Sequence, residues 1–266
     1  MGLADLHIHS IHSYDGTATI PAILKYTAEK TSLNVIAITD HDSMDGVQQA
    51  LDLAPAYGLK VIPGCEITSA RGHVLALFIK KPIPAGLSFL DTLLLIGEQG
   101  GIAIAAHPLA KGTSSLNFED IQQACSHPFA SKILVGVEAF NGGLVYTRSN
   151  SSIALQSSQL PLAQVGNSDA HILQMIGQGA SFFPGKSIID LRMALIQRQT
   201  SVAAHGNLHG AQVLTSYLPK YFLRILGWAI WNANPQAPLK YARINQLTPR
   251  PTTRVVKLLH QMIFEY

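Results

Sequence analysis

The 266-residue chain is 47% apolar and 13% charged with a formal net charge of +3, which excludes a disordered protein and fits one large domain with or without an appendage. Its two cysteines, Cys65 and Cys125, lie in unrelated contexts, which excludes a disulfide framework and a zinc ribbon and suits a reducing cytosol. No apolar run approaches the roughly 20 residues that span a bilayer, and the first residues show no signal-peptide pattern, so we expect a cytoplasmic protein.

Short apolar runs alternate with segments of helical spacing from residue 3 to about residue 204. The expected strands are Leu3–Ile8, Val35–Thr39, Lys60–Pro63, His73–Ile79, Gly101–Ala106, Ile133–Glu138 and Pro161–Val165. The expected helices are Ile20–Glu29, Val47–Ala56, Ser88–Glu98, Asn117–Ala124, Val145–Ser157 and, after a turn at Phe182–Gly185, Ser187–Gln197. Apolar strands alternating with amphipathic helices indicate a buried parallel sheet, and this many repeats favour a closed or distorted (β/α) barrel over an open sheet.

Residues 207–266 differ from the rest, because they hold five prolines, seven of the 19 basic residues and one of the 16 acidic residues. We expect two apolar, basic helices there, Tyr217–Trp231 and Thr253–Phe264. The chain therefore divides into a domain at 1–206 and a helical appendage at 207–266. Three roles for the appendage remain open: packing on the barrel or on a second subunit, weak contact with a membrane surface, or contact with a polyanion such as RNA.

The positions of the histidines carry most of the functional information. Five of the eleven lie at or just beyond the C-terminal end of an expected strand, and a sixth begins the strand that follows Glu66. These histidines are His7, His9, His41, His107, His171 and His73, and the carboxylates beside them are Asp5, Asp15, Asp40, Asp42, Glu66 and Asp169. Active sites of parallel (β/α) folds form at the C-terminal ends of the strands, so the set predicts a metal site. Taken one at a time, each group could instead be a loop histidine or a capping carboxylate.

The motifs that hold these residues resemble those of the PHP (polymerase and histidinol phosphatase) superfamily, in the family's order. They are Asp5-Leu6-His7-Ile8-His9-Ser10 with Asp15-Gly16, Thr39-Asp40-His41-Asp42, Gly64-Cys65-Glu66, Gly72-His73-Val74-Leu75, Ala106-His107-Pro108 and Ser168-Asp169-Ala170-His171. The resemblance covers roughly residues 3–205. It implies a distorted seven-stranded (β/α) barrel with a trinuclear metal centre at the C-terminal ends of the strands.

The resemblance also implies three groups of metal ligands. One group is His7, His9, Glu66 and Asp169; a second is Glu66, His73 and His107; a third is Asp15, His41 and His171. Some family members have a histidine where Asp15 stands, and the carboxylate favours manganese or iron over zinc at that position. We expect two or three divalent ions per chain, Mn, Fe or Zn.

The implied activity is hydrolysis of phosphomonoesters or of nucleotide and oligonucleotide phosphodiesters. Two metal ions roughly 3.5–4 Å apart can clamp phosphoryl oxygens, and a hydroxide bridging two ions would attack phosphorus. Protonation of the leaving group falls to His41, to His171 or to water, and Asp40 is counted with these two histidines among the expected catalytic residues. We expect Asp5, Asp40 and Asp42 to orient ligand imidazoles. The alternatives are a non-catalytic, regulatory metal-binding module and amidohydrolase-type hydrolysis of a non-phosphate substrate.

Substrate phosphate needs polar and cationic groups outside the metal cluster. We expect Arg71, Lys111, Arg148, Asn141 and Ser10 to supply them, with Glu138 facing the cavity beside Asn141. A solvated surface position is the alternative for each cation. The substrate would be a phosphorylated small molecule, a nucleotide or a short RNA, and no stable protein partner is implied. Only about thirty residues separate His73 from His107, too few for the helical domain that some relatives insert there, so we expect an open site.

Overall fold

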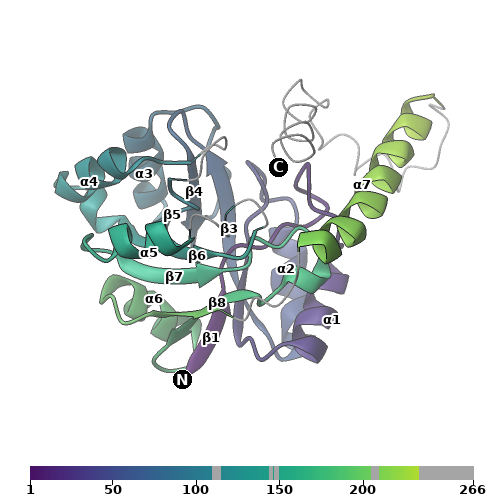
Figure 1. Cartoon of the computed structure of the whole chain (residues 1–266), viewed down its shortest axis with the longest axis horizontal. Coiled ribbons are helices and arrows are strands. Elements are labelled where there is room, and N and C mark those ends of the chain that lie inside the picture. The colour runs from purple at the N-terminus through teal and green to yellow at the C-terminus, as the bar shows by residue number, and fades with distance from the viewer. Residues whose placement is uncertain (110–114, 144–145, 147–149, 205–209, 234–266) are drawn as a thin grey trace.

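The computed structural model describes residues 1–109, 115–143, 146, 150–204 and 210–233. Within these residues, nine strands form one curved sheet in the order β7-β6-β5-β4-β3-β2-β1-β8-β9, with helices packed around it (Figure 1). The strands are β1 (Gly2–Asp5), β2 (Val35–Ile38), β3 (Lys60–Thr68), β4 (His73–Leu77), β5 (Ile102–Ala105), β6 (Leu134–Asn141), β7 (Ala163–Asn167), β8 (Gly179–Phe183) and β9 (Ser201–Ala204). The α-helices are α1 (Ile20–Lys30), α2 (Val47–Leu53), α3 (Phe89–Glu98), α4 (Phe118–Ser126), α5 (Asn150–Ser157), α6 (Ile188–Ile196) and α7 (Gly210–Ala233). The distorted barrel expected from the sequence is thereby confirmed.

The direction of the strands corrects the expectation of a parallel sheet. Strand β4 runs antiparallel to both β3 and β5, and β8 runs antiparallel to both β1 and β9. Only residues 69–72 connect β3 to β4, whereas a parallel crossover needs about a dozen residues or more. The short connection therefore makes these two strands a hairpin, which extends β3 to Thr68 and brings Glu66 opposite Leu75.

Strands β8 and β9 were not expected, and the turn expected at Phe182–Gly185 is wrong at its start, because Phe182 and Phe183 complete β8. These two strands bring the free edge of the sheet round to β7. The Ser181 hydroxyl donates to Gly166 O at 2.9 Å and accepts from Gly166 N at 3.0 Å, and Thr200 Oγ1 donates to Gln164 O at 2.8 Å. Side-chain hydrogen bonds thus link β7 to β8 and to the start of β9, and they nearly close the barrel.

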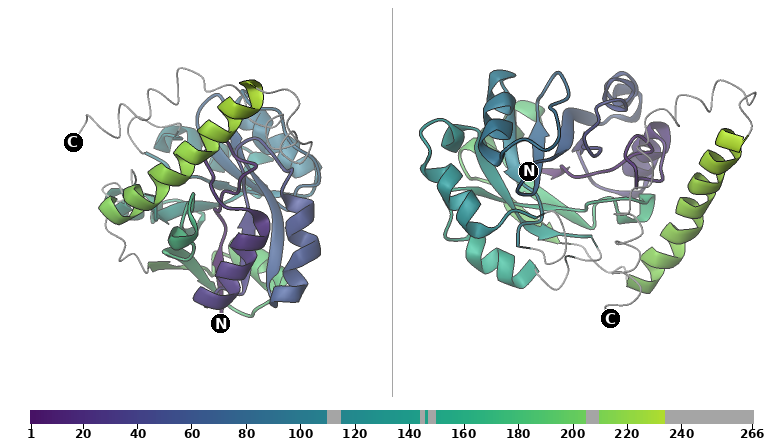
Figure 2. Two further views of the ribbon diagram at one scale, coloured as in Figure 1. Left: turned by 90° about the vertical axis from the view of Figure 1, so that its right-hand side faces the viewer. Right: turned by 90° about the horizontal axis from the view of Figure 1, so that it is seen from above.

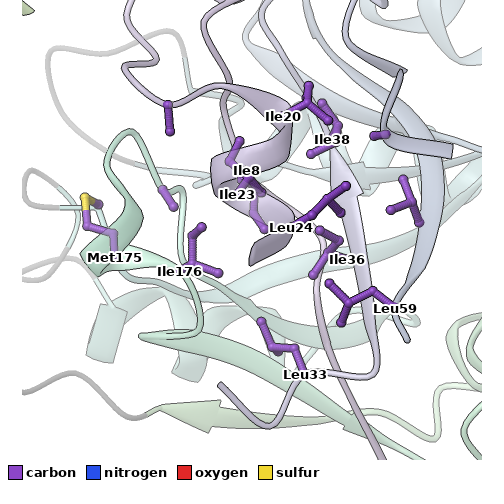
Figure 3. Close-up of a cluster of buried hydrophobic side chains, with 14 of the residues drawn as sticks. Ile8, Ile20, Ile23, Leu24, Leu33, Ile36, Ile38, Leu59, Met175 and Ile176 are labelled. Carbon is purple, nitrogen blue, oxygen red and sulfur yellow. The ribbon is translucent and has the colours of Figure 1, made fainter. Parts of the chain in front are cut away.

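Apolar side chains fill both faces of the sheet. One buried cluster lies between α1 and β2 and includes Ile23, Leu24 and Ile36 (Figure 3). Alternate positions of the same strands, such as Val35 in β2, belong to another cluster that α6 covers with Leu191. Each such side chain contributes roughly 1.5–3 kcal/mol when it is fully buried. This packing fixes the strand ends from which the polar residues project.

The helix expected at Tyr217–Trp231 is present as the longer α7, which contains Pro219 and leans against one side of the barrel (Figure 2). Its Val213 packs in the same cluster as α1. The second helix expected in this segment, Thr253–Phe264, lies outside the described residues. Within the described part of the chain, no helix combines the length and the apolar character needed to cross a bilayer.

Candidate metal centre

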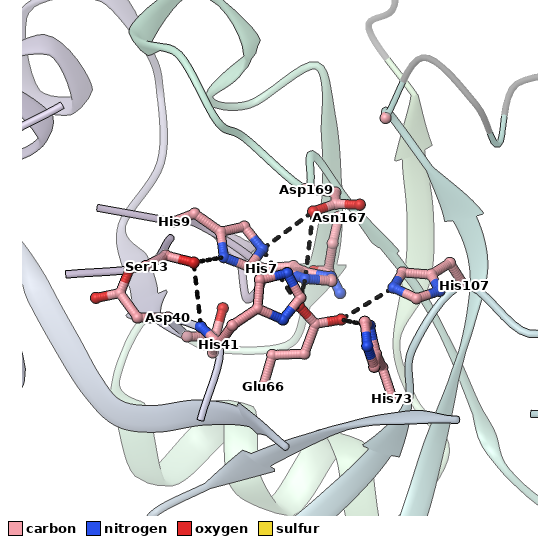
Figure 4. Close-up of polar contacts among 12 residues, drawn as sticks. His7, His9, Ser13, Asp40, His41, Glu66, His73, His107, Asn167 and Asp169 are labelled. Atoms are coloured by element: carbon pink, nitrogen blue, oxygen red, sulfur yellow. Dashed lines mark hydrogen bonds and ion pairs between the residues drawn. The ribbon is translucent and has the colours of Figure 1, made fainter. Parts of the chain in front are cut away.

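Ligand-type side chains from separate strand ends meet at one end of the barrel (Figure 4). Two isolated parallel bridges, Ile8 with Ala170 and His41 with Glu66, continue the sheet pairing beyond the regular strands. The first bridge joins the segments after β1 and β7, and the second joins the segment after β2 to β3. The nine residues expected as metal ligands all belong to overlapping clusters of close donor atoms: His7, His9, Asp15, His41, Glu66, His73, His107, Asp169 and His171.

Glu66 occupies the middle of the cluster and is 1% exposed. Its Oε1 atom lies 3.0 Å from His73 Nδ1 and 2.9 Å from His107 Nε2. Its Oε2 atom lies 3.2 Å from His7 Nε2 and 3.1 Å from His41 Nδ1. One carboxylate therefore faces four imidazoles and joins the groups of candidate ligands to one another.

The first expected group, His7, His9, Glu66 and Asp169, is close-packed. Asp169 Oδ1 lies 3.3 Å from His7 Nε2 and 3.1 Å from His9 Nε2. The Nε2 atom of His9 is also 3.4 Å from Glu66 Oε2. Both imidazoles thus turn Nε2 toward the same two carboxylates.

The third expected group forms around Asp15, in the loop after β1. Asp15 Oδ2 lies 3.1 Å from His171 Nε2 and 3.4 Å from His41 Nε2. Donor atoms of His9 complete this cluster, in which all four lie within 4.8 Å of one another. His41 turns its Nδ1 toward Glu66 and its Nε2 toward Asp15, so it spans two groups rather than belonging to one.

The nitrogen and oxygen atoms of this cluster are better arranged to bind divalent cations than to hydrogen-bond one another. Four buried atoms in the described cluster make no hydrogen bond although each has an oppositely polarised neighbour within 3.2 Å: His7 Nε2, His41 Nδ1, His73 Nδ1 and Glu66 Oε2. A buried polar atom left without a partner costs about 1–3 kcal/mol. Imidazole nitrogens with carboxylate oxygens are a donor set that Zn, Fe and Mn accept. The side chains therefore surround positions at which a bound cation would supply the missing partner of each of these four atoms.

The charges of the cluster favour a cation. Burial would raise the pKa of Asp15, but His171 and His41 outweigh it and hold that pKa well below the ordinary value. Burial would likewise lower the pKa of His41, but Glu66 and Asp15 raise it to about 9. Burial does lower the pKa of His9, to about 4, and neighbouring His171 adds to the effect. Asp15 is thus ionised at neutral pH, and a proton on His41 balances charge that a bound metal ion would otherwise balance.

Two of these residues have strained backbones. The φ angle of His107 is 26° and that of Asp169 is 51°, and residues other than glycine rarely have positive φ. Such strain costs on the order of 1–3 kcal/mol and concentrates at functional sites. The two side chains are therefore aimed into the cluster at the expense of local stability.

Glu138 in β6 orients two of the histidines. Its Oε1 atom lies 2.9 Å from His7 Nδ1, and its Oε2 atom accepts from the His107 backbone N–H at 2.6 Å. Asn167 and Asn141 each donate a side-chain N–H to this carboxylate, at 2.7 and 2.9 Å. With Nδ1 engaged by Glu138, His7 presents Nε2 to Glu66 and to any cation bound there. Glu138 does face the site, as expected.

The three aspartates expected to orient imidazoles do something else, which corrects that expectation. Asp5 accepts from the backbone N–H groups of Ser168 and Gly177, each at 3.0 Å. Both oxygens of Asp40 accept from Ser10, at 2.5 Å from its N–H and 2.7 Å from its hydroxyl. Asp42 accepts from a backbone N–H in β3 at 2.7 Å. The three aspartates therefore hold loops in place and do not orient imidazole rings. A catalytic role for Asp40 stays a prediction.

The residues expected to bind substrate are only partly described. The Arg71 guanidinium donates to the Asp120 carboxylate, with N–O distances of 3.1–3.2 Å. Its charge is therefore already paired within the protein. Ser10 and Asn141 are at most 1% exposed and hydrogen-bond to Asp40 and Glu138, and Asn141 also donates to Asp169 at 3.4 Å, so contact of either residue with substrate stays a prediction. Lys111 and Arg148 lie outside the described residues.

Several residues at the site escaped the sequence reasoning. Tyr14 stacks on His41 with ring centroids 4.7 Å apart, and Tyr146 stacks on His107 at 4.4 Å. The hydroxyl of Ser13 lies 3.3 Å from His9 Nδ1 and donates to Asp15 Oδ1 at 2.7 Å. Ser13 and Tyr14 lie between His9 and Asp15 of the first motif, so proximity in sequence was the only signal for them. Tyr146 lies far from every motif, and its contact with His107 arises from the tertiary structure alone.

Comparison with known proteins agrees with this geometry. The profile of the PHP domain family matches residues 5–139, and that of the PHP-associated family matches residues 148–200. An uncharacterized protein of Methanocaldococcus jannaschii is 34% identical over 147 residues, which are 52% of this chain and 81% of that protein. A 5'-3' exoribonuclease of Haemophilus influenzae is 33% identical over 104 residues, 38% of this chain and 37% of that enzyme.

Among solved structures, a two-domain protein from Bacteroides vulgatus, described as containing a predicted PHP-like metal-dependent phosphoesterase, superposes with a TM-score of 0.61. The match covers 83% of this chain and 69% of that chain at 22% identity. At this identity the similarity shows a shared fold.

Proposed function

The chain belongs to the PHP domain family, and from that premise we propose that this metal-dependent hydrolase cleaves phosphoesters, either phosphomonoesters or nucleotide and oligonucleotide phosphodiesters. The observation that carries the proposal is the cluster around Glu66, in which four buried donor atoms have no hydrogen-bond partner. The similarity to an exoribonuclease supports a phosphoester as the substrate. We further propose that the nine clustered residues hold two or three divalent ions, Mn, Fe or Zn, as a trinuclear centre when fully loaded.

The chemistry divides between ions and protein. When bound, such ions would lower the pKa of water from ~15.7 to about 7 and would stabilise negative charge on phosphoryl oxygens. The protein excludes bulk water, because His7, His9 and Glu66 are at most 1% exposed. Glu138 holds His7 in one tautomer, and Ser13 lies against the outer nitrogen of His9.

The two histidines expected to protonate the leaving group differ in access. The side chain of His171 is 22% exposed, whereas that of His41 is 7% exposed and stacked under Tyr14. A general acid must reach the oxygen that leaves with the product, at the open side of the site. Of the two, His171 is the more accessible, but it can act as this acid only while its own metal position is empty, because a nitrogen that binds a cation cannot also carry the proton.

A substrate screen combined with elemental analysis tests the proposal. Purified protein would be assayed with added Mn²⁺ on p-nitrophenyl phosphate, bis-p-nitrophenyl phosphate, nucleotides, short RNA and an amide substrate. We expect turnover on at least one phosphate ester, and loss of both turnover and bound metal in His9→Ala and Asp169→Asn. Asp52→Asn is the matched control, because Asp52 is an exposed residue of α2.

Each alternative predicts a different result. Bound metal without turnover on any substrate would indicate a regulatory module, and turnover on the amide alone would indicate an amidohydrolase. Unchanged phosphatase activity after either substitution in the cluster would contradict the proposed site.

A further inference from the structure

Helix α7 lies against the loop that carries Asp15. This loop, residues 10–17, joins the two histidines after β1 to α1. Asp15 contributes the carboxylate around which His41 and His171 gather, so its position decides whether that group of donors is complete. The residues of α7 that face the loop are therefore part of the surroundings of the site.

A single guanidinium ties the two ends of this loop together. Arg224 in α7 donates from Nη1 to Gly16 O and from Nη2 to Ile11 O, the latter at 3.0 Å. About two turns earlier on the same face, the Tyr217 hydroxyl donates to Asp15 O at 3.2 Å. Three backbone carbonyls of the loop thus receive hydrogen bonds from α7, and those from Arg224 are charge-assisted.

The remaining supports of the loop come from the barrel. Asp40 accepts from Ser10 at the beginning of the loop, and Thr17 donates to His171 O at the end, with Oγ1 at 2.7 Å. Between these two anchors, Gly16 is pressed against the backbone of Ser10, where an added Cβ would lie 2.0 Å from the Ser10 carbonyl oxygen. The loop therefore has little room to move inward, and α7 closes it from outside.

The placement of Arg224 also suits the charge of the site. The residue is half-buried, and its positive charge acts on the ionised Asp15 and on Asp40. A lysine could not reproduce the arrangement, because one ammonium group lacks the planar fork that reaches two carbonyls at once.

We propose that Arg224 is a positioning residue for Asp15, and that α7 thereby completes the third group of metal donors. The inference rests on the proposed function, since it assumes that Asp15, His41 and His171 bind a cation. It assigns the part of α7 from Tyr217 to Arg224 to the active site rather than to an independent appendage. It also predicts that a change remote from every ligand lowers the occupancy of one metal position and leaves the others filled.

The test compares Arg224→Ala and Arg224→Lys with wild type in the full-length chain. Lys220→Ala is the matched control, because it removes the same charge from an exposed position on the same helix. Mn²⁺ binding would be measured by equilibrium dialysis with elemental analysis, and kcat and KM would be measured at low and high Mn²⁺. For Arg224→Ala we expect one Mn²⁺ equivalent to bind about tenfold or more weakly, the others unchanged, and kcat to recover as Mn²⁺ is raised. Arg224→Lys should be intermediate, and Lys220→Ala should match wild type.

The outcomes separate this inference from the proposed function. If wild type binds no Mn²⁺ at these residues, the proposed function fails. If wild type binds it and Arg224→Ala binds it with the same stoichiometry and affinity, the positioning role is overturned. Should Arg224→Ala unfold, Arg224→Lys keeps the charge but lacks the fork that reaches Gly16 O and Ile11 O, and unchanged Mn²⁺ affinity in that variant would overturn the inference.

Discussion

Glu138 shows how a buried residue without direct contact to substrate can control the metal site. Its carboxylate is fully buried and engages His7 Nδ1, the His107 backbone N–H and two asparagine side chains. Partners of this kind fix the tautomer and orientation of a ligand histidine, and their loss typically lowers metal affinity about 10–100-fold. A glutamine at this position would point its side-chain N–H at groups that are themselves hydrogen-bond donors.

We therefore expect Glu138→Gln to weaken metal binding by about 10–100-fold while the protein still folds. Isothermal titration with Mn²⁺ would measure the affinity, and circular dichroism would check the fold. Glu119→Gln, at an exposed position in the first turn of α4, is the control and should bind as wild type does. Equal affinities for the Glu138 and Glu119 variants would mean that Glu138 does not orient the ligands.

Gly16 and Gly58 allow the effect of a residue on the site to be separated from its effect on stability. A Cβ at position 16 would collide with the Ser10 backbone, whereas position 58 has open space but a φ of 69°. We expect both alanine variants to lose about 1–3 kcal/mol of unfolding free energy, one through overpacking and the other through backbone strain. Only Gly16→Ala should also displace Asp15. Denaturant unfolding with metal analysis would check this, and normal metal content in Gly16→Ala would contradict it.

At the residue scale, the sequence pattern singled out the histidines and carboxylates that cluster, but not the residues that hold them in place. The sequence distinguishes His7, His9 and Asp169 from other polar residues, because histidines and carboxylates recur at the ends of the expected strands. Asn167 and Arg224 could not be found in this way, since an amide or a cation gains its role only from the neighbours that folding brings. For the same reason, the pairing of Arg71 was not predicted, because its partner Asp120 is remote in the chain.

At the scale of elements, the strands were predicted better than their directions. Hydrophobic periodicity does not encode direction, so β4 was wrongly placed in a parallel sheet although its short link to β3 was a usable signal. Strands β8 and β9 were missed because the first begins with Gly-Ala-Ser and the second, Ser-Val-Ala-Ala, lacks the repeated branched apolar residues that mark the four-residue strands β2 and β5. The boundary between 1–206 and 207–266 stays a prediction.

Helix α6 was predicted at nearly its observed bounds, and its first turn explains why. Ser187 accepts from Asp190 N at 3.0 Å and Asp190 accepts from Ser187 N at 2.9 Å, which forms a capping box. We expect Ser187→Ala to lower the unfolding free energy by about 0.5–2 kcal/mol, because the Asp190 N–H loses its acceptor. Urea unfolding would measure the change, with the exposed Ser131→Ala as control. A loss no greater than that of the control would show that the cap does not stabilise the protein.

At the scale of the whole molecule, the site joins segments from both ends of the described chain. Asn34, between α1 and β2, accepts from the Leu3 backbone N–H at 3.0 Å, and Asn167 in β7 accepts from Leu6 N at 2.9 Å. Glu66 then faces histidines from four different segments. A cation bound among these residues would cross-link the barrel, and the stability of the fold and the occupancy of the site should be coupled.

Removal of metal should therefore destabilise the entire protein. A ligand that binds only the folded state at about 100 times its Kd adds about 2.7 kcal/mol, and for 150–250 residues each kcal/mol shifts Tm by about 2–4 °C. We expect EDTA to lower the Tm of the Mn²⁺-saturated protein by about 5–10 °C, measured by calorimetry, and excess Mn²⁺ to restore it. Glu66→Gln should respond little to either treatment, because its neutral side chain no longer links the groups of donors. An identical Tm for wild type with Mn²⁺ and with EDTA would show that the stability of the fold does not depend on a bound cation. The buried nitrogen and oxygen atoms of the cluster would then gain nothing from a cation.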